Sequence, residues 1–599
     1  MAGSEKREQT LSKTVKTCRL MLEFAWSGRE GRLFIVIKAL MAVVNAGFSV
    51  IYTVIPGVII NELIDEARIL YLALYVVLLV LSPLVGYCLN KLSGMALFRL
   101  KNEVELSLRM KFLGDSLDMD YEKLENPEIQ ILKRRAAFAL DGVFDTIDTV
   151  TGLLSSVTRI AAMSTVISTL NPLIILLTAV LALINFIAAK RSNYKKYLIG
   201  KKSDTYESRR EELGYVLDFI SYIKEIRIFA MKDFLLSKYV DNQQKLNHAS
   251  VDSYKESLRA EECGTLTGAG RQILLYAYLI YCVIKAGLSV GGLTIYISAV
   301  ASLSSALSSV ASSYIELSNS SLNIQDYIEF VNIPSMQKSC GHKTPIFDEK
   351  SLIEFKGVSF KYSGSDRYAV KNLNLTIRGG ERLCIVGENG SGKSTFIKLL
   401  TRLYFPLEGE ILLNGVNVNE YDFDEYQKLF SPVFQDFSLF WTSFGENITF
   451  KESGDKEKME KVCGECGLTE LVGKLPHGYD TQIGKMVDPE GFEPSGGEGQ
   501  KIAIARAIYH NAPVYLLDEP TAALDPLAEY KIYRKFHEMV GSRCAVLITH
   551  RLSAVQLADK VAVFDDGHVV EYGTHSELYA KGGIYRDMFD KQAEFYREV

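Results

Sequence analysis

Six apolar stretches, separated by polar connections, occupy the first half of the chain. Each is long enough for the hydrocarbon core of a bilayer, which takes about 20 helical residues. The stretches lie at 31–61, 69–93, 139–169, 171–191, 264–286 and 292–317. Only a tight turn separates the third stretch from the fourth, and the fifth from the sixth. The pattern predicts six membrane-spanning helices.

The two long connections, 94–138 and 192–263, keep a helical pattern outside the bilayer. Apolar residues recur three to four positions apart and helix breakers are few, and structureless loops of this length are uncommon in compact proteins. We therefore expect the spans to continue as helices, about 25 residues projecting roughly 35–40 Å into the cytosol. Turn-prone midpoints near Pro127 and Asp233 predict short transverse helices that dock on the second half of the chain.

Basic residues are concentrated in these same two connections, and the other connections between spans hold almost none. Arg99 and Lys101 lie in the first long connection, and Lys195 and Lys196 in the second. Basic loops next to spans stay on the cytoplasmic side, so both termini should be cytoplasmic. We expect a multi-pass protein of the cell (plasma) membrane, in contact with membrane lipids. The net charge of -5 over 599 residues gives no indication of a nucleic-acid partner.

A short amphipathic segment, residues 11–28, precedes the first span. Its apolar residues recur at helical spacing, and its charged residues fall off that stripe. The stripe consists of Leu11, Val15, Cys18, Leu22 and Ala25. This spacing predicts a helix on the membrane surface with Trp26 near the interface, and an ordinary surface helix is the alternative.

Three basic residues, Lys38, Arg159 and Arg271, lie within apolar stretches. Each costs roughly 2.5–3.5 kcal/mol at the bilayer centre on insertion scales, so each needs an aqueous cavity or a partner. One interpretation is a substrate passage of cationic character. The other is that they snorkel to the interface or pair with the acidic residues of the spans. The acidic candidates are Asp145, Asp148 and Glu316.

A phosphate-binding loop dominates the second half of the chain, which follows a polar linker at 335–351. The segment 387–395 reads GENGSGKST and fits the pattern G-x-x-x-x-G-K-[ST]. A short apolar strand precedes it and a helix follows, which is the context that the motif requires. Backbone N–H groups of such a loop surround an anion, the lysine reaches the β- and γ-phosphates, and the following serine can ligate Mg²⁺. The expected nucleotide contacts are Gly387, Asn389, Gly390, Ser391, Gly392, Lys393, Ser394 and Thr395.

Further polar residues stand at the ends of predicted strands. Gln435 can coordinate Mg²⁺ or a water molecule, and the strand 514–518 ends in the acids Asp518 and Glu519. A carboxylate delivered by a buried strand suits Mg²⁺, and its neighbour can polarise an attacking water. His550, after another strand, can hydrogen-bond a γ-phosphate. These residues predict a nucleotide hydrolase site with Asp518 as metal ligand and Glu519 as base.

Two other features flank this site. Tyr362 precedes the loop and can stack on an adenine ring, although a core aromatic is the alternative. The segment 494–501 reads PSGGEGQK before a helical run, and small residues at a helix N-terminus form a second anion site, which can serve the nucleotide of another chain. Cys463 and Cys466 form a C-x-x-C pair without a second pair to complete a zinc site.

This ordered set of motifs resembles the ATPase domain of ABC transporters. The set comprises Tyr362, GENGSGKST at 387–395, Gln435, SGGE at 495–498, LLDEP at 516–520, ALD at 523–525 and His550. The six preceding spans with two long cytoplasmic extensions resemble an exporter-type (type IV) half-transporter. The expected architecture is an all-α six-helix membrane domain at 1–334, a linker at 335–351 and an α/β P-loop ATPase domain at 352–599.

The resemblance implies a role for each matching residue. Tyr362 stacks the adenine of ATP. Lys393, Ser394 and Thr395 hold phosphates and Mg²⁺, and Gln435 and Asp518 complete the metal site. Glu519 is the catalytic base and His550 contacts the γ-phosphate. The segment 495–497, which is Ser495, Gly496 and Gly497, closes over ATP bound to a second half-transporter, identical or different.

The implied function is ATP-driven export of an amphiphilic substrate by alternating access. A drug, a lipid or a hydrophobic peptide would fit the apolar spans. An importer on the same fold, or an ATP-gated regulator without cargo, is the alternative. The signature segment departs from the family's LSGGQ at Pro494 and Glu498. Because proline is tolerated at a helix start, we expect function to be kept, but the two ATP sites of a dimer need not be equal.

Overall fold

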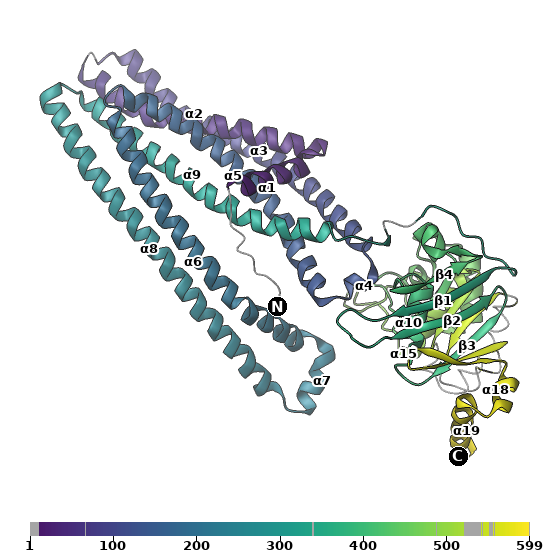
Figure 1. The fold of residues 1–599 in the computed structure, drawn as a ribbon. Coiled ribbons are helices and arrows are strands. Elements are labelled where there is room, and N and C mark those ends of the chain that lie inside the picture. The colour runs from purple at the N-terminus through teal and green to yellow at the C-terminus, as the bar shows by residue number, and fades with distance from the viewer. Residues whose placement is uncertain are drawn as a thin grey trace. The chain divides into compact units, whose positions relative to one another are not determined.

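The computed structural model describes residues 11–65, 67–337, 341–486, 488–519, 541, 543–549, 555 and 558–597. The chain forms two compact units, shown as ribbons in Figure 1. The first comprises Met1–Ser116 and Ile131–Ile333, and the second Leu117–Gln130 and Pro334–Val599. The predicted domain boundaries at 334 and 352 divide the chain once, whereas the second unit also includes Leu117–Gln130, which lies between two spans. These boundaries therefore stay a prediction.

The first unit is helical, and its long helices carry the six predicted spans. The six candidate spans of the described residues are α2 (Arg29–Ile64), α3 (Ile69–Leu117), α5 (Pro127–Ser168), α6 (Leu173–Asp218), α8 (Lys232–Ala286) and α9 (Val290–Val331). The expected helical extensions are confirmed, because α3 runs for 49 residues and α8 for 55. At 1.5 Å per residue these helices are about 75 and 80 Å long. Figure 1 shows α6 and α8 side by side along their length.

Close packing of α2 against α9 depends on glycine. A Cβ atom built on Gly291 would lie 2.1 Å from the carbonyl oxygen of Gly57, so the two backbones meet at a distance that no larger residue allows. The side-chain oxygen of Asn61 accepts a hydrogen bond from the Gly291 N–H at 3.0 Å. Small residues with interhelical hydrogen bonds are the usual means of helix association in membranes.

The amphipathic helix α1 (Leu11–Trp26) packs on α2 and α9. Within its predicted apolar stripe, Cys18 and Ala25 are buried, together with Met21. The predicted helix is confirmed, while its place on the membrane surface stays a prediction. Val15 and Trp26 remain exposed.

The basic residues of the spans have different surroundings. The Lys38 Nζ atom lies 2.7 Å from Asp148 Oδ1, so the pairing alternative is confirmed for this lysine. Arg159 donates a hydrogen bond to Ser156 Oγ at 3.4 Å. A passage lined by Lys38 as a free cation is therefore excluded in this structure.

The second unit contains two sheets and the helices around them. A four-stranded antiparallel sheet has the order β2 (Val370–Arg378), β1 (Leu352–Phe360), β4 (Glu408–Leu413), β5 (Val416–Asn417). A six-stranded sheet has the order β10 (His568–Gly573), β9 (Lys560–Asp565), β3 (Arg382–Gly387), β8 (Cys544–Ile548), β7 (Val514–Asp518), β6 (Phe430–Val433). All neighbours in it are parallel except β10 and β9.

Helices complete this unit. They are α4 (Tyr121–Leu124), α10 (Lys393–Leu400), α11 (Phe423–Gln427), α12 (Phe444–Thr449), α13 (Lys456–Glu465), α14 (Thr469–Lys474), α15 (Gly496–His510), α18 (His575–Lys581) and α19 (Ile584–Arg597). The core includes Phe355 of β1, Phe396 of α10 and Phe564 of β9, with ring centroids 4.8 and 5.8 Å from Phe396. The buried aromatics join both sheets to the helix after the phosphate loop.

The segment around α4 docks within the second unit, as the sequence predicts for the first transverse helix. Glu125 accepts hydrogen bonds from Lys398 Nζ, at 3.3 Å, and from the hydroxyl of Tyr404. Asp120 accepts from the backbone N–H groups of Met336 and Gln337, both at 3.0 Å. The second short helix, α7 (Ile220–Ile228), belongs to the first unit, and its docking stays a prediction.

Candidate ATP-binding site

The phosphate loop joins β3 to α10, and its glycines are required by its backbone. Gly387 and Gly392 have φ values of 154° and 102°. A Cβ atom on Gly387 would lie 2.2 Å from the carbonyl oxygen of Phe564, and one on Gly392 would lie 2.4 Å from that of Ala369. The loop therefore keeps a shape that turns backbone N–H groups toward one point at the start of α10.

Lys393 lies inside this loop and is 5% exposed. Its Nζ atom donates hydrogen bonds to the carbonyl oxygens of Gly387 and Glu388 at 2.9 and 2.8 Å. Burial lowers the pKa of Lys393 from its ordinary value, while the nearby charges of Glu519 and Asp518 act in the opposite direction. The ammonium group is thus held at the loop and is available to an anion placed there.

The carboxyl ends of four neighbouring strands meet at this edge of the sheet. The phosphate loop follows β3, Gln435 follows β6, Asp518 ends β7 and Thr549 follows β8. Parallel pairing brings these ends together because all four strands run in the same direction. His550 lies outside the described residues. The other residues predicted from separate motifs, Gln435, Asp518 and Glu519, meet the phosphate loop in space.

Asp518 is buried and carries an unsatisfied acceptor. It is 5% exposed, and its Oδ1 atom has no hydrogen-bond partner among the described residues. Burial, the largest cause, and the charges of Glu519 and Asp436 raise the pKa of Asp518, a hydrogen bond with Ser394 and the charge of Lys393 lower it, and the net result is a pKa of about 6. A buried, partly satisfied carboxylate beside a serine hydroxyl fits the oxygen ligands that Mg²⁺ takes. The Ser391 Oγ atom, in the loop, likewise has no hydrogen-bond partner in the part of the chain that the structure describes.

Glu519 stands next to Asp518 in a strained backbone conformation. Its φ is 47°, in the left-handed region that non-glycine residues rarely adopt, and its N–H donates to the carbonyl oxygen of Ile548 at 3.1 Å. Its Oε2 atom accepts a hydrogen bond from Gln435 Nε2 at 3.2 Å. Strain of this kind is concentrated at functional sites. Gln435 and Glu519 therefore form one hydrogen-bonded pair at the edge of the loop.

Tyr362 contacts the loop directly. Its hydroxyl lies 3.0 Å from Thr395 Oγ1, and its ring packs edge-on against Phe360 and Tyr404 at centroid distances of 5.4 and 5.5 Å. The ring is only half-buried. Asn389 and Ser394 are exposed at the same loop.

A cluster around Lys398 is invisible in the sequence pattern. The Lys398 Nζ atom lies 5.6, 5.9 and 4.9 Å from the ring centroids of Tyr121, Tyr362 and Tyr404. It also lies 3.3 Å from Glu125 Oε1. The cluster thus connects α4 with the tyrosine next to the phosphate loop. Of these residues only Tyr362 carries a signal of its own, because the cluster is assembled from three separate segments of the chain.

The signature segment begins α15, and its glutamate is engaged within it. The Ser495 N–H and hydroxyl donate to Glu498 Oε2 at 2.9 and 2.7 Å, and the Glu498 N–H donates to Ser495 Oγ at 3.4 Å, forming a capping box. These hydrogen bonds, that of the Ser495 side chain first, lower the pKa of Glu498 below its ordinary value. An ionised carboxylate therefore stands at the N-terminus of α15, where Gly496 and Gly497 form its first turn.

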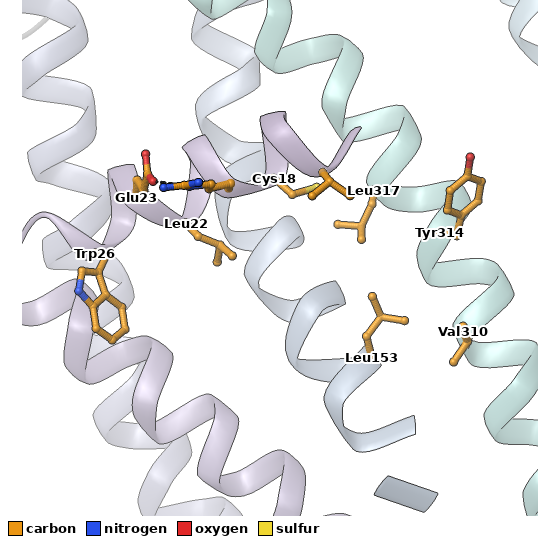
Figure 2. Close-up of a pocket in the computed structure, with 10 residues that line it drawn as sticks. Cys18, Leu22, Glu23, Trp26, Leu153, Val310, Tyr314 and Leu317 are labelled. Atoms are coloured by element: carbon orange, nitrogen blue, oxygen red, sulfur yellow. Dashed lines mark hydrogen bonds and ion pairs between the residues drawn. The ribbon is translucent and has the colours of Figure 1, made fainter. Parts of the chain in front are cut away.

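The first unit contains an apolar pocket beneath α1 with a volume of about 610 Å³. Figure 2 shows Leu22 and Trp26 of α1 on the same side as Leu153 of α5 and Tyr314 of α9. Arg19 and Glu23, which pair at 2.8 Å, lie at its edge. The pocket offers apolar surface in the half of the chain that carries the spans.

Comparison with known proteins agrees with this geometry. The ABC transporter family matches residues 370–522. The chain is 30% identical over 562 residues to the subtilin transport ATP-binding protein SpaT of Bacillus subtilis, covering 91% of this chain and 90% of that protein. It is 28% identical over 422 residues to the ATP-dependent lipid A-core flippase of Pasteurella multocida, covering 68% of this chain and 69% of that protein.

A solved structure shares the fold. A bacterial Atm1-family ABC exporter with ATP bound aligns with a TM-score of 0.81 at 21% identity, covering 93% of this chain and 99% of that one. Six apolar helices followed by an α/β ATPase unit are common to both. The fold, the ATPase match and the whole-length relative lead to one conclusion: this chain belongs to the ABC transporter family, as a multi-pass exporter half-transporter that binds ATP and couples its hydrolysis to transport.

Proposed function

We propose that the chain exports an amphiphilic molecule from the cytoplasmic side of the plasma membrane, with Mg²⁺ and a second half-transporter completing each ATP site. The observation that carries the proposal is the convergence of the phosphate loop, Gln435, Asp518 and Glu519 at one edge of the sheet, in a chain with six spans. The apolar pocket beneath α1 supports an amphiphilic cargo. Half-transporters of this family function as dimers, and the partner is an identical or a different chain.

We assign the roles from the motifs, supported by this geometry for the described residues. Lys393 and the loop N–H groups bind the phosphates, Tyr362 stacks on adenine, and Ser394, Gln435 and Asp518 hold Mg²⁺. ATP supplies the phosphoryl group whose transfer to water drives the cycle. Glu519 orients the attacking water and accepts its proton, and His550 contacts the γ-phosphate. Ser495, Gly496 and Gly497 bind the phosphates held by the partner subunit, so closure and release of the two ATPase units move the spans.

Transport into inside-out membrane vesicles tests the proposed direction. Vesicles that carry the full-length chain in its native assembly should accumulate a labelled amphiphile when ATP is added, because the ATPase half then faces the medium. Vesicles with the Glu519→Gln variant should not accumulate it. ATP-dependent accumulation in right-side-out vesicles loaded with ATP would show import instead, and ionic currents that persist while hydrolysis is blocked would show a gated regulator.

The charge of Glu498 predicts that the signature segment, residues 495–498, binds the phosphates of ATP weakly. A carboxylate at the N-terminus of α15 repels the phosphates that this segment is proposed to bind. Glu498→Gln keeps the capping box, since glutamine also serves at this position, but it removes the charge. We expect the KM for ATP to fall by about two- to fivefold at low salt, the usual size of a charge effect at a helix end.

A matched control separates charge from folding. Glu577 caps α18 in an equivalent box with Thr574, so Glu577→Gln should leave the KM unchanged. The gain from Glu498→Gln should shrink as ionic strength rises, because salt screens exposed charges. An unchanged or higher KM at low salt would contradict the assigned position of Glu498.

A further inference from the structure

A polar cavity of about 590 Å³ lies between α2, α3 and α9 in the first unit. Its lining includes Asn45 and Ser49 of α2, Tyr87 and Asn90 of α3, and Ser298 and Ser302 of α9. All six residues lie within stretches that the sequence assigns to the membrane. Polar side chains in spans are costly toward lipid and usually face the interior of a bundle or an aqueous cavity.

Two amides meet across this cavity. Asn45 Nδ2 donates to Asn90 Oδ1 at 3.3 Å, and Asn90 Nδ2 donates to Asn45 Oδ1 at 3.2 Å. Each carboxamide has two N–H donors and an oxygen with two acceptor sites. The reciprocal pair therefore leaves one N–H and one acceptor site on each residue for a ligand.

Hydroxyl groups around the amide pair are also available. The side chains of Ser49, Tyr87, Ser298 and Ser302 make no hydrogen bond with other residues in the described part of the chain. Many other serine and threonine hydroxyls in these helices bond to a carbonyl of their own helix, as Thr53 does to Ser49 at 2.8 Å. Tyr87 is 64% exposed and the three serines are partly exposed, so these hydroxyls are open to water or to a polar ligand.

The described residues that line the cavity are uncharged. No lining residue that the structure describes is acidic or basic, and Lys38 is paired with Asp148 elsewhere. A charged head group would therefore lose its hydration without gaining a counter-charge. The ring of Phe48, which lies 3.4 Å from a Cβ atom built on Gly86, supplies an apolar wall.

We infer that this cavity binds the head group of the exported amphiphile, and that this head group is uncharged and rich in hydroxyl or carboxamide groups. The inference rests on the proposed export function and names its substrate class. The amides and hydroxyls of α2, α3 and α9 replace the water around such a head group, while Phe48 contacts the apolar part. Anionic and cationic amphiphiles bind there more weakly.

Photocrosslinking tests the selectivity. The full-length chain in lipid nanodiscs is labelled with an alkyl glucoside that carries a diazirine, and the labelled peptides are identified by mass spectrometry. Unlabelled alkyl glucoside, alkyl sulfate and alkyl trimethylammonium of the same chain length serve as competitors. We expect label in α2, α3 or α9 around the cavity, and competition by the glucoside alone. Equal competition by either charged amphiphile, or label elsewhere only, would overturn the inference.

Paired variants test the residues. Asn45→Leu combined with Asn90→Leu removes both partners and so leaves no orphan amide. We expect labelling to fall at least about fivefold, the loss of one or more hydrogen bonds. The matched control replaces Asn193 and Asn319 by Leu, a reciprocal amide pair at 3.1 and 3.5 Å that does not line the cavity. Unchanged labelling in the Asn45 and Asn90 variant would overturn the inference.

A milder variant covers the case in which that protein fails to fold. Ser298→Ala with Ser302→Ala removes hydroxyls without adding bulk, and it should lower labelling while the ATPase rate without amphiphile stays at the wild-type level. Labelling equal to wild type would count against the site. Export of a charged amphiphile without label in the cavity would overturn the inference and leave the export function intact. Glucoside-selective label in a chain that fails to export would support the site and overturn the proposed direction.

Discussion

Glu519→Gln is expected to lower the ATPase rate at least about 100-fold, the lower end of what a general base contributes, while ATP binding is retained. Glutamine has the same shape as glutamate, and its side-chain oxygen can still accept the hydrogen bond that Gln435 donates at 3.2 Å. The strained backbone at φ 47° is unaffected by the exchange. Only the ability to accept a proton from water is lost.

Steady-state hydrolysis and binding of labelled ATP measure the two effects separately. Glu408→Gln, an exposed position on β4, serves as the matched control and should behave as wild type in both assays. The Glu519→Gln protein should also hold ATP for longer than wild type. The closed ATP site between the two subunits reopens only after hydrolysis, which this variant does not perform. A wild-type ATPase rate for purified Glu519→Gln protein would refute the role of this acid.

Asp518→Asn is expected to abolish most Mg²⁺-dependent hydrolysis and, in the absence of nucleotide, to stabilise the fold at neutral pH. An amide keeps one oxygen but loses the negative charge that a divalent cation needs, so hydrolysis should fall by about 100-fold or more. Ser394 and Gln435 alone provide no charged ligand. Hydrolysis measured over a range of Mg²⁺ concentrations checks this part.

The stability effect follows from the pKa of about 6 for Asp518, against a usual value of 3.8. The folded state binds this proton more tightly than the unfolded state, so the carboxyl destabilises the nucleotide-free fold as the pH rises from about 4 to 6. The penalty is complete above pH 6 and amounts to at most about 3 kcal/mol. The amide of the Asp518→Asn variant carries no such penalty. The variant should therefore melt at a higher temperature than wild type at pH 7 and at nearly the same temperature at pH 4.

Thermal unfolding of the full-length protein in EDTA, at both pH values, measures this difference. Asp566→Asn is a suitable control, because Arg367 lowers the pKa of that exposed aspartate instead of raising it. A lower melting temperature for Asp518→Asn at pH 7 would contradict the raised pKa.

The same raised pKa predicts that Mg²⁺ affinity of the wild type weakens as the pH falls below about 6, since protons and the cation compete for this carboxylate.

Much of the architecture could be predicted without a structure. The six spans, the helical extensions and the phosphate loop each depend on residues that are close in sequence. Long apolar runs directly predict segments that lie in lipid. The strand and the helix that flank the phosphate loop are adjacent to it in the sequence, so they are predictable from the same stretch. The ATPase residues Asp518 and Glu519 follow a buried strand, so their position at a sheet edge was also predictable.

Contacts between distant segments were not predictable. Glu125 with Tyr404 and Lys398 joins residues that are far apart along the chain. The local pattern around Glu125 shows only a turn before Pro127. The contacts that bury Cys18 and Ala25 are of the same kind, since an apolar stripe fits a membrane surface and a helix bundle equally well.

The sequence by itself determined the division into a span-rich half and a nucleotide-binding half, because hydrophobic length and local motifs are short-range properties. Only the tertiary structure decided which side chains meet. It paired Lys38 with Asp148 and Asn45 with Asn90, and it showed that the Glu498 carboxylate accepts a hydrogen bond from Ser495. Such pairings depend on how helices are rotated and packed against one another, and the spacing of residues within one helix carries no record of that rotation.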